Sequence, residues 1–171
     1  MGQLLIIEGP DGVGKTTLAR QVQEATPGAR RLSYGPPPSY AKSWRDAWGI
    51  DLVEARVVGH EHVISDRGLM GHAVWHRLMP EANESLLVDA INLGDMLAEV
   101  EAHWHLRVVI LARSRRGMRE ELASRFEDAS VPLRSVALYY SLHRTLVDLG
   151  VDAQIWESGA ALARDPRGWW E

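Results

Sequence analysis

Residues 4–18 read LLIIEGPDGVGKTTL, and this stretch decides the fold. The run LLII at residues 4–7 is short and apolar, which is typical of a buried strand. Residues 9–16 then match G-x-x-x-x-G-K-[ST], the signature of a phosphate-binding loop. From Thr16 onward the apolar residues have helical spacing. The motif therefore stands between a strand and a helix, which is the context that it requires.

The residue types of this loop suit a phosphate ligand. Glycine lets the backbone adopt positive φ and approach phosphate oxygens closely. The free N–H groups of the loop and of the helix start then point toward the anion. We expect Lys15 to reach the outer phosphates and the Thr16 hydroxyl to bind Mg²⁺. The loop alone leaves the reaction open, because switches, motors and kinases all use it.

Length, composition and charge narrow the class of protein. The 171 residues are enough for one domain with a sizeable core, and 46% hydrophobic with 25% charged residues is ordinary for a globular protein. A net charge of −4 argues against general binding to nucleic acid, and the absence of cysteine excludes disulfide and thiolate chemistry. The first predicted strand leaves no room for a signal peptide, and no apolar run approaches the ~20 residues of a membrane span. We expect a cytoplasmic protein without a membrane partner.

Strands and helices are predicted to alternate along the whole chain. The predicted strands cover residues 3–8, 29–34, 62–66, 106–111 and 151–156. The predicted helices cover residues 14–25, 40–58, 69–78, 84–103 and 132–149, followed by a short tail helix. This alternation predicts a three-layer α/β/α sandwich with a parallel sheet of about five strands. Because ligands of such sheets bind beyond the carboxyl ends of the strands, polar groups at those ends are candidate site residues.

Four polar residues stand at or near these strand ends. Asp66 could orient water on Mg²⁺ or accept a proton, or it could simply cap a helix. Arg67 could hold a second phosphate through its planar guanidinium. Glu8 could position an acceptor or act as a base, or it could be a partly buried acid paired with an arginine. Asp11 lies inside the phosphate loop and should turn outward, toward an acceptor hydroxyl, because phosphates would repel it.

Other polar and aromatic residues indicate a function less specifically. Five arginines lie between residues 112 and 130, where a solvated helix is the default interpretation. One or two of them, with Arg119 and Arg125 as the candidates, could instead stabilise the transferring phosphoryl group from a lid. Trp75 could stack on a base or could equally belong to the core. The histidine pairs His60/His62 and His103/His105 lie at strand entrances, opposite the expected site, and are interpreted as surface residues.

Several of these stretches resemble the thymidylate kinases and their relatives. Residues 7–17, IEGPDGVGKTT, are similar to the family's "EGxDGxGKTT" phosphate loop. Residues 63–67, VISDR, resemble its second signature, a strand ending in Asp-Arg that is followed by an aromatic residue nine positions after the Asp, where Trp75 stands. Residues 124–127, SRFE, look like the "DRFE" element of the lid, and Tyr139-Tyr140 matches a tyrosine pair on a long helix.

The resemblance implies a P-loop NTPase fold, a single kinase domain over residues 1–171 and a short lid over about residues 112–130. It implies transfer of the γ-phosphate of ATP to a deoxynucleoside monophosphate. The implied ATP-binding residues are Gly9, Asp11, Gly12, Val13, Gly14, Lys15, Thr16 and Thr17. The residue chemistry and the resemblance together predict four substrate-binding residues, Glu8, Asp11, Arg67 and Trp75. Together they also predict six catalytic residues, Lys15, Asp66, Arg67, Glu8, Arg125 and Arg119. Mg²⁺ would lie at Thr16 and Asp66, directly or through water.

Departures from the family pattern keep other acceptors open. Residues 34–38, YGPPP, lack the arginine of the family's Arg-Glu-Pro-Gly type motif, and the chain is shorter than most. One alternative is a deoxynucleoside kinase, in which Glu8 would activate a 5′-hydroxyl. Another is a phage-type kinase acting on a modified base in DNA, such as 5-hydroxymethyluracil, and only there would DNA be a partner.

A P-loop ATPase or switch is the alternative of a different class. The Asn-Lys-x-Asp element of guanine-reading switches is absent from the sequence, and Asp66-Arg67-Gly68 breaks the Asp-x-x-Gly spacing that switches usually show. The expected partner of the chain is thus a nucleotide or nucleoside. The family's usual dimers lead us to expect a homodimer as well.

Overall fold

The computed structural model describes residues 1–33, 44–71, 74, 93–113 and 130–170. Five strands form one sheet in the order β2-β3-β1-β4-β5, and every neighbouring pair is parallel. The strands are β1 (Gly2–Glu8), β2 (Arg30–Ser33), β3 (His62–Asp66), β4 (Trp104–Ala112) and β5 (Asp152–Glu157). The predicted parallel sheet of about five strands is therefore confirmed.

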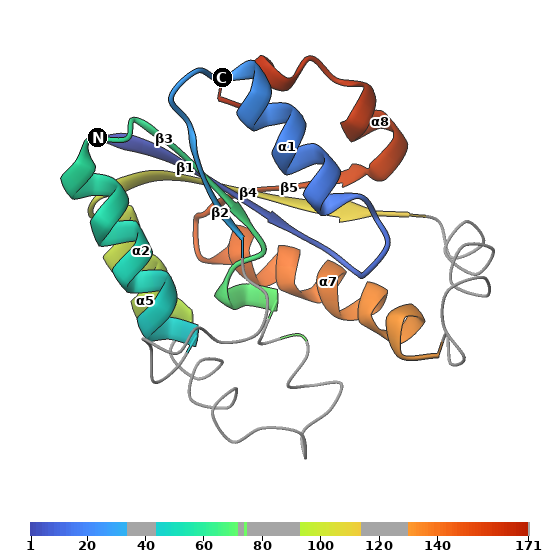
Figure 1. The fold of residues 1–171 in the computed structure, drawn as a ribbon. Coiled ribbons are helices and arrows are strands. Elements are labelled where there is room, and N and C mark those ends of the chain that lie inside the picture. The colour runs from blue at the N-terminus through green and yellow to red at the C-terminus, as the bar shows by residue number, and fades with distance from the viewer. Residues whose placement is uncertain (34–43, 72–73, 75–92, 114–129, 171) are drawn as a thin grey trace.

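Helices cover both faces of the sheet, as Figure 1 shows. One face carries α1 (Lys15–Ala25), α8 (Ser158–Ala163) and the 3₁₀ helix η1 (Pro166–Trp169). The other face carries α2 (Trp44–Val58), α5 (Leu93–Glu101) and α7 (Ser130–Asp148). This arrangement confirms the predicted three-layer α/β/α sandwich.

The central strand β1 explains why the sequence begins with a continuous apolar run. Leu4 and Ile6 belong to the core beneath α2, α5 and α7, whereas Leu5 and Ile7 belong to the core beneath α1 and α8. Successive side chains of a strand point to opposite faces, so a strand buried on both faces needs apolar residues at every position.

The register of the sheet brings polar residues from different strands together at the carboxyl ends of the strands. Ile7 of β1 pairs with Asp66 of β3, and Glu8 pairs with Ile110 of β4. The carboxyl ends of β1 and β3 therefore lie side by side, directly before the phosphate loop and the Asp66-Arg67 turn. This position agrees with the place predicted for the site.

The predicted elements differ from the structure mainly at their ends. β4 begins at Trp104 rather than at residue 106, and α7 begins at Ser130 rather than at residue 132. Gly150 has a φ of 84° just after α7, as expected of a residue that ends a helix. Trp75, residues 34–38 and residues 114–129, with Arg119 and Arg125, lie outside the described residues. In the part of the chain that is described, no helix has the length and apolar character to cross a membrane.

Candidate active site

The phosphate loop turns between β1 and α1 through glycines with positive φ. Gly9, Gly12 and Gly14 have φ values of 139°, 81° and 89°. Gly14 is the left-handed N-cap of α1, and no side chain in the described part of the chain caps this helix end. The first N–H groups of α1 are thus left for an anion, which is the arrangement found at phosphate-binding helix starts. Thr16 and Thr17 are exposed on the first turn of α1.

The loop is fixed from both sides by the rest of the fold. A Cβ at Gly9 would lie 2.4 Å from the Leu111 carbonyl oxygen, so only glycine fits against β4 there. On the other side, the buried Ser158 at the start of α8 donates a 2.5 Å hydrogen bond to the Val13 carbonyl. Tyr139 of α7 is buried as well, and burial raises the pKa of its phenol well above the usual value, against the opposing effect of the Gly9 backbone. The loop is therefore preorganised rather than held by its glycines alone.

Lys15 lies folded across this loop. Its Nζ donates to the carbonyl oxygens of Gly9 at 2.7 Å and Pro10 at 2.6 Å, and it lies 3.7 Å from Asp11 Oδ1. The side chain is only 5% exposed. Burial, with the nearby charge of Arg67, lowers the pKa of Lys15 to about 8. The ammonium is thus poorly solvated, and an anion in the loop would be a favourable new partner.

Glu8 is fully buried at the end of β1 and caps the helical turn that follows β3. Its Oε1 accepts hydrogen bonds from the backbone N–H groups of Gly68 at 2.8 Å and Gly71 at 2.9 Å. The side chain is buried rather than partly exposed, and no arginine of the described residues is hydrogen-bonded to it. The other oxygen, Oε2, has no hydrogen-bond partner among the described residues. Burial raises the pKa of Glu8 to about 7, against the opposing effect of the two backbone hydrogen bonds.

Asp66 and Arg67 stand beside Glu8 at the end of β3. Asp66 is 3% exposed, and its Oδ1 has no hydrogen-bond partner within the described part of the chain. Arg67 is half-exposed, and its Nη2 lies 2.9 Å from Asp11 Oδ1. This ion pair joins the phosphate loop to β3. The structure thus places Asp11 and Arg67 against each other, where the sequence suggested separate contacts to an acceptor.

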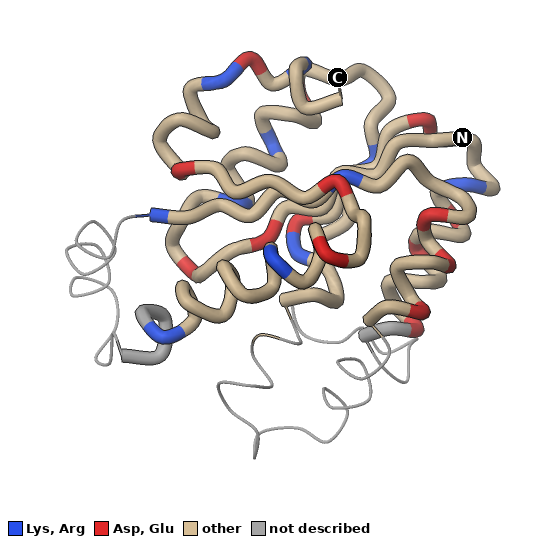
Figure 2. Tube along the Cα trace, turned by 180° about the vertical axis from the view of Figure 1, so that it is seen from behind, with Lys and Arg blue, Asp and Glu red and all other residues tan. Residues whose placement is uncertain are grey.

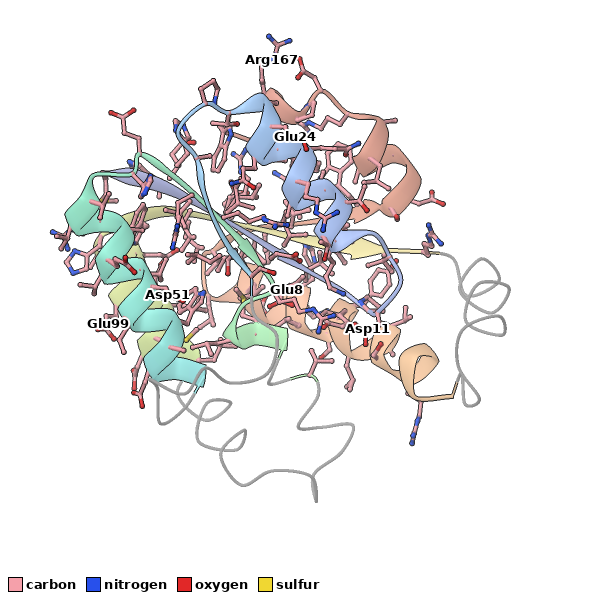
Figure 3. All side chains as sticks on the ribbon, viewed as in Figure 1. Glu8, Asp11, Glu24, Asp51, Glu99 and Arg167 are labelled. Atoms are coloured by element: carbon pink, nitrogen blue, oxygen red, sulfur yellow. The ribbon has the colours of Figure 1, made fainter. Side chains whose placement is uncertain are left out.

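These charges form one electrostatic cluster. The pKa of Lys15 responds to Arg67, Asp11, Glu8 and Asp66 together. Glu8 and Asp11 lie at the same end of the sheet, whereas Glu24 lies at the far end of α1 (Figure 3). The arrangement can bind phosphate at the loop and a second anionic or hydroxyl group near Arg67.

The donor set fits a magnesium ion held together with phosphates. Asp66 offers a buried carboxylate oxygen without a partner, and Thr16 offers an exposed hydroxyl on the first turn of α1. Among the described residues, no group of three or more acidic or histidine side chains could hold a metal by itself. Mg²⁺ commonly takes one or two protein oxygens and completes its shell with phosphate and water, so these two residues suffice.

Four residues that the sequence analysis did not single out support the site through hydrogen bonds. They are Ser65, Gly68, Gly71 and Ser158. Only Ser158 carried a usable signal, because it follows the carboxyl end of β5 and opens a helix. The histidine pairs lie at the amino ends of the strands, opposite the site. There His60 contacts the Gly28 carbonyl at 3.1 Å and His62 packs against Trp170.

Comparison with known proteins gives a fold but no family. No protein-family model matches the chain, and no curated protein matches it either. Polyphosphate kinase 2 from Arthrobacter aurescens TC1 matches with a TM-score of 0.61 and 17% identity, over 96% of this chain and 65% of that one. Thymidylate kinase from Ehrlichia chaffeensis matches with a TM-score of 0.60 and 10% identity, over 95% of each chain.

Deoxyadenosine kinase from M. mycoides, solved with bound dCTP, matches with a TM-score of 0.53 and 14% identity, over 94% of this chain and 95% of that one. Identities this low show a shared fold and not a shared activity. Together with the five parallel strands and the glycine loop after β1, these likenesses show that the chain has the P-loop NTPase fold.

Proposed function

We propose that this protein is an ATP-dependent kinase that transfers the γ-phosphate to a deoxynucleoside monophosphate. The observation that carries the proposal is the Arg67–Asp11 pair at the end of β3, directly beside a loop that suits ATP phosphates. A kinase needs this adjacency of a donor and an acceptor site, whereas a simple ATPase does not. The kinases with similar folds support the reaction type, and the thymidylate kinase among them supports the acceptor class.

In the proposed reaction an oxygen of the acceptor phosphate attacks the γ-phosphorus, the bond to the β–γ bridging oxygen breaks, and ADP leaves. The N–H groups at the start of α1 hold the ATP phosphates, and Lys15 exchanges the Gly9 and Pro10 carbonyls for phosphate oxygens. Arg67 holds the acceptor phosphate, and Asp66 orients the groups around Thr16. A bound Mg²⁺ would neutralise charge on the transferring phosphoryl group.

A deoxynucleoside acceptor is the second candidate, and Glu8 favours it. An Oε2 that no described residue contacts by a hydrogen bond and a pKa of about 7 suit a base that takes a proton from a 5′-hydroxyl at neutral pH. DNA carrying a modified base is less well supported. Lysine and arginine positions are scattered over the described chain in Figure 2 rather than gathered on one face.

The proposal is tested by ADP release with Mg-ATP against a panel of acceptors. The panel holds the four deoxynucleoside monophosphates, the matching nucleosides, and DNA with and without 5-hydroxymethyluracil. Turnover with one or more monophosphates is the expected result. Turnover with nucleosides alone, lost in Glu8→Gln, would replace the proposal with the second candidate. ATP hydrolysis that is indifferent to every acceptor would refute a kinase.

The proposal extends to the single domain, to a lid over about residues 112–130 and to a homodimer. α2 exposes Ile50, Val53 and Val57 at 48%, 63% and 81%, an apolar stripe with helical spacing that a second copy would cover. Antiparallel pairing about a two-fold axis near Val53 would set this stripe against its own copy. Light scattering should give the mass of a dimer, and Val53→Lys should give a monomer; a monomeric native protein would refute the pairing.

A further inference from the structure

Arg67 has a backbone conformation that its residue type does not favour. Its φ is 77°, and it is the one non-glycine residue with positive φ in the described part of the chain. A left-handed conformation is unfavourable for a residue with a Cβ, because the Cβ comes too close to the following carbonyl oxygen. Such a conformation persists only where the surroundings hold it, and it is often found at functional sites.

A buried hydrogen-bonded relay holds this residue in place. The Arg67 N–H donates to the Ile7 carbonyl at 3.0 Å, and the Arg67 carbonyl accepts a 2.5 Å bond from the Ser65 hydroxyl. The Ser65 oxygen in turn accepts a 3.1 Å bond from Trp48 Nε1. Ser65 and Trp48 are 0% and 2% exposed. The relay therefore runs from α2 through the core to the turn that carries the Arg67 guanidinium.

We propose that Ser65 and Trp48 are positioning residues that keep Arg67 left-handed and so aim its guanidinium at the acceptor. The inference rests on the proposed function, in which Arg67 binds the acceptor phosphate. The hydroxyl suits this role because it donates to one partner while it accepts from the other. If the relay is broken, φ of Arg67 can relax to negative values, which redirects its side chain away from Asp11.

The kinetic test separates acceptor binding from ATP binding. Ser65→Ala should raise KM for the acceptor about tenfold or more and change KM for ATP less than about twofold. Trp48→Phe keeps the ring and removes only the indole donor, so it should raise KM for the acceptor by about two- to threefold. Ser158→Ala is the matched variant, because this buried serine donates to Val13 in the phosphate loop; it should raise KM for ATP instead. An equal rise of both KM values in Ser65→Ala would overturn the proposal.

A double-mutant cycle separates positioning from general stability. Arg67→Gly removes both the side chain and the backbone cost, so Ser65→Ala should have no further effect on KM for the acceptor in that background. The same fold-change in both backgrounds would overturn the relay.

A structural readout keeps this inference separate from the proposed function. If the native protein uses no phosphorylated acceptor, the proposed function fails, and crystal structures of Ser65→Ala and Trp48→Phe test the relay on their own. A negative φ at Arg67 with the contact to Asp11 lost supports the relay. An unchanged φ and an intact Arg67–Asp11 contact would overturn it.

Discussion

Replacing Glu8 by glutamine should change the free energy of unfolding in a way that depends on pH. The variant should gain stability over the native protein as the pH rises from acid to neutral. Burial raises the pKa of Glu8 from 4.5 to about 7, so the folded protein holds this proton more tightly than the unfolded chain does. The native protein therefore loses stability as pH rises from about 4.5 to about 7. The full effect is about 3 kcal/mol, of which about 2 kcal/mol falls between about pH 5 and about pH 7.5.

The glutamine variant lacks this proton equilibrium but can still accept hydrogen bonds from Gly68 and Gly71 through its amide oxygen. Its free energy of unfolding minus that of the native protein should rise by about 2 kcal/mol across that pH range. In a domain of this length the corresponding change in relative Tm is roughly 4–8 °C.

The assay is urea unfolding followed by the fluorescence of the seven tryptophans, at several pH values. The difference between variant and native protein cancels the titration of the other groups. Glu24→Gln, on the exposed side of α1, is the control and should show no such trend. A difference for Glu8→Gln that stays constant within about 0.5 kcal/mol would refute the argument that burial destabilises the ionised carboxylate.

Three further predictions concern the loop and the end of β3. Lys15→Ala should abolish turnover, by about a thousandfold or more, and leave the circular dichroism spectrum unchanged; retained turnover would contradict the loop assignment. Asp66→Asn should lower kcat far more than ATP affinity measured by calorimetry, and a loss of ATP affinity alone would remove Asp66 from the chemistry. Gly9→Ala should cost about 3–5 kcal/mol in urea unfolding, because its Cβ would collide with Leu111 in addition to the backbone strain. Gly28→Ala, with a φ of 82° and open space, should cost only about 1–2 kcal/mol, and equal costs would show that the collision is relieved.

The sequence was most informative where chemistry is local. Strand, loop and helix around Lys15 follow from a contiguous motif and from apolar periodicity, and β3 has the predicted bounds. The cap that Glu8 supplies was not predictable, because Gly68 and Gly71 follow Glu8 in the chain by 60 and 63 positions. The same holds for the Arg67–Asp11 pair and for the positive φ of Arg67, which depend on how β1 and β3 are paired. Local sequence patterns therefore predict helices and strands, whereas the pairing of distant strands determines which side chains come into contact.

The place of β1 at the centre of the sheet also sets the order in which the protein can assemble. The strand that carries the phosphate loop is made first, but it lies between β3 and β4, and β4 ends at Ala112. During synthesis at ~5–20 residues per second, the LLII segment waits some 5–20 s before its second neighbour exists. For that time an apolar strand lacks one of its neighbours and has unpaired backbone groups, which favours aggregation or chaperone binding. The loop after β1 can thus take its place between two paired strands only once β4 has been synthesised.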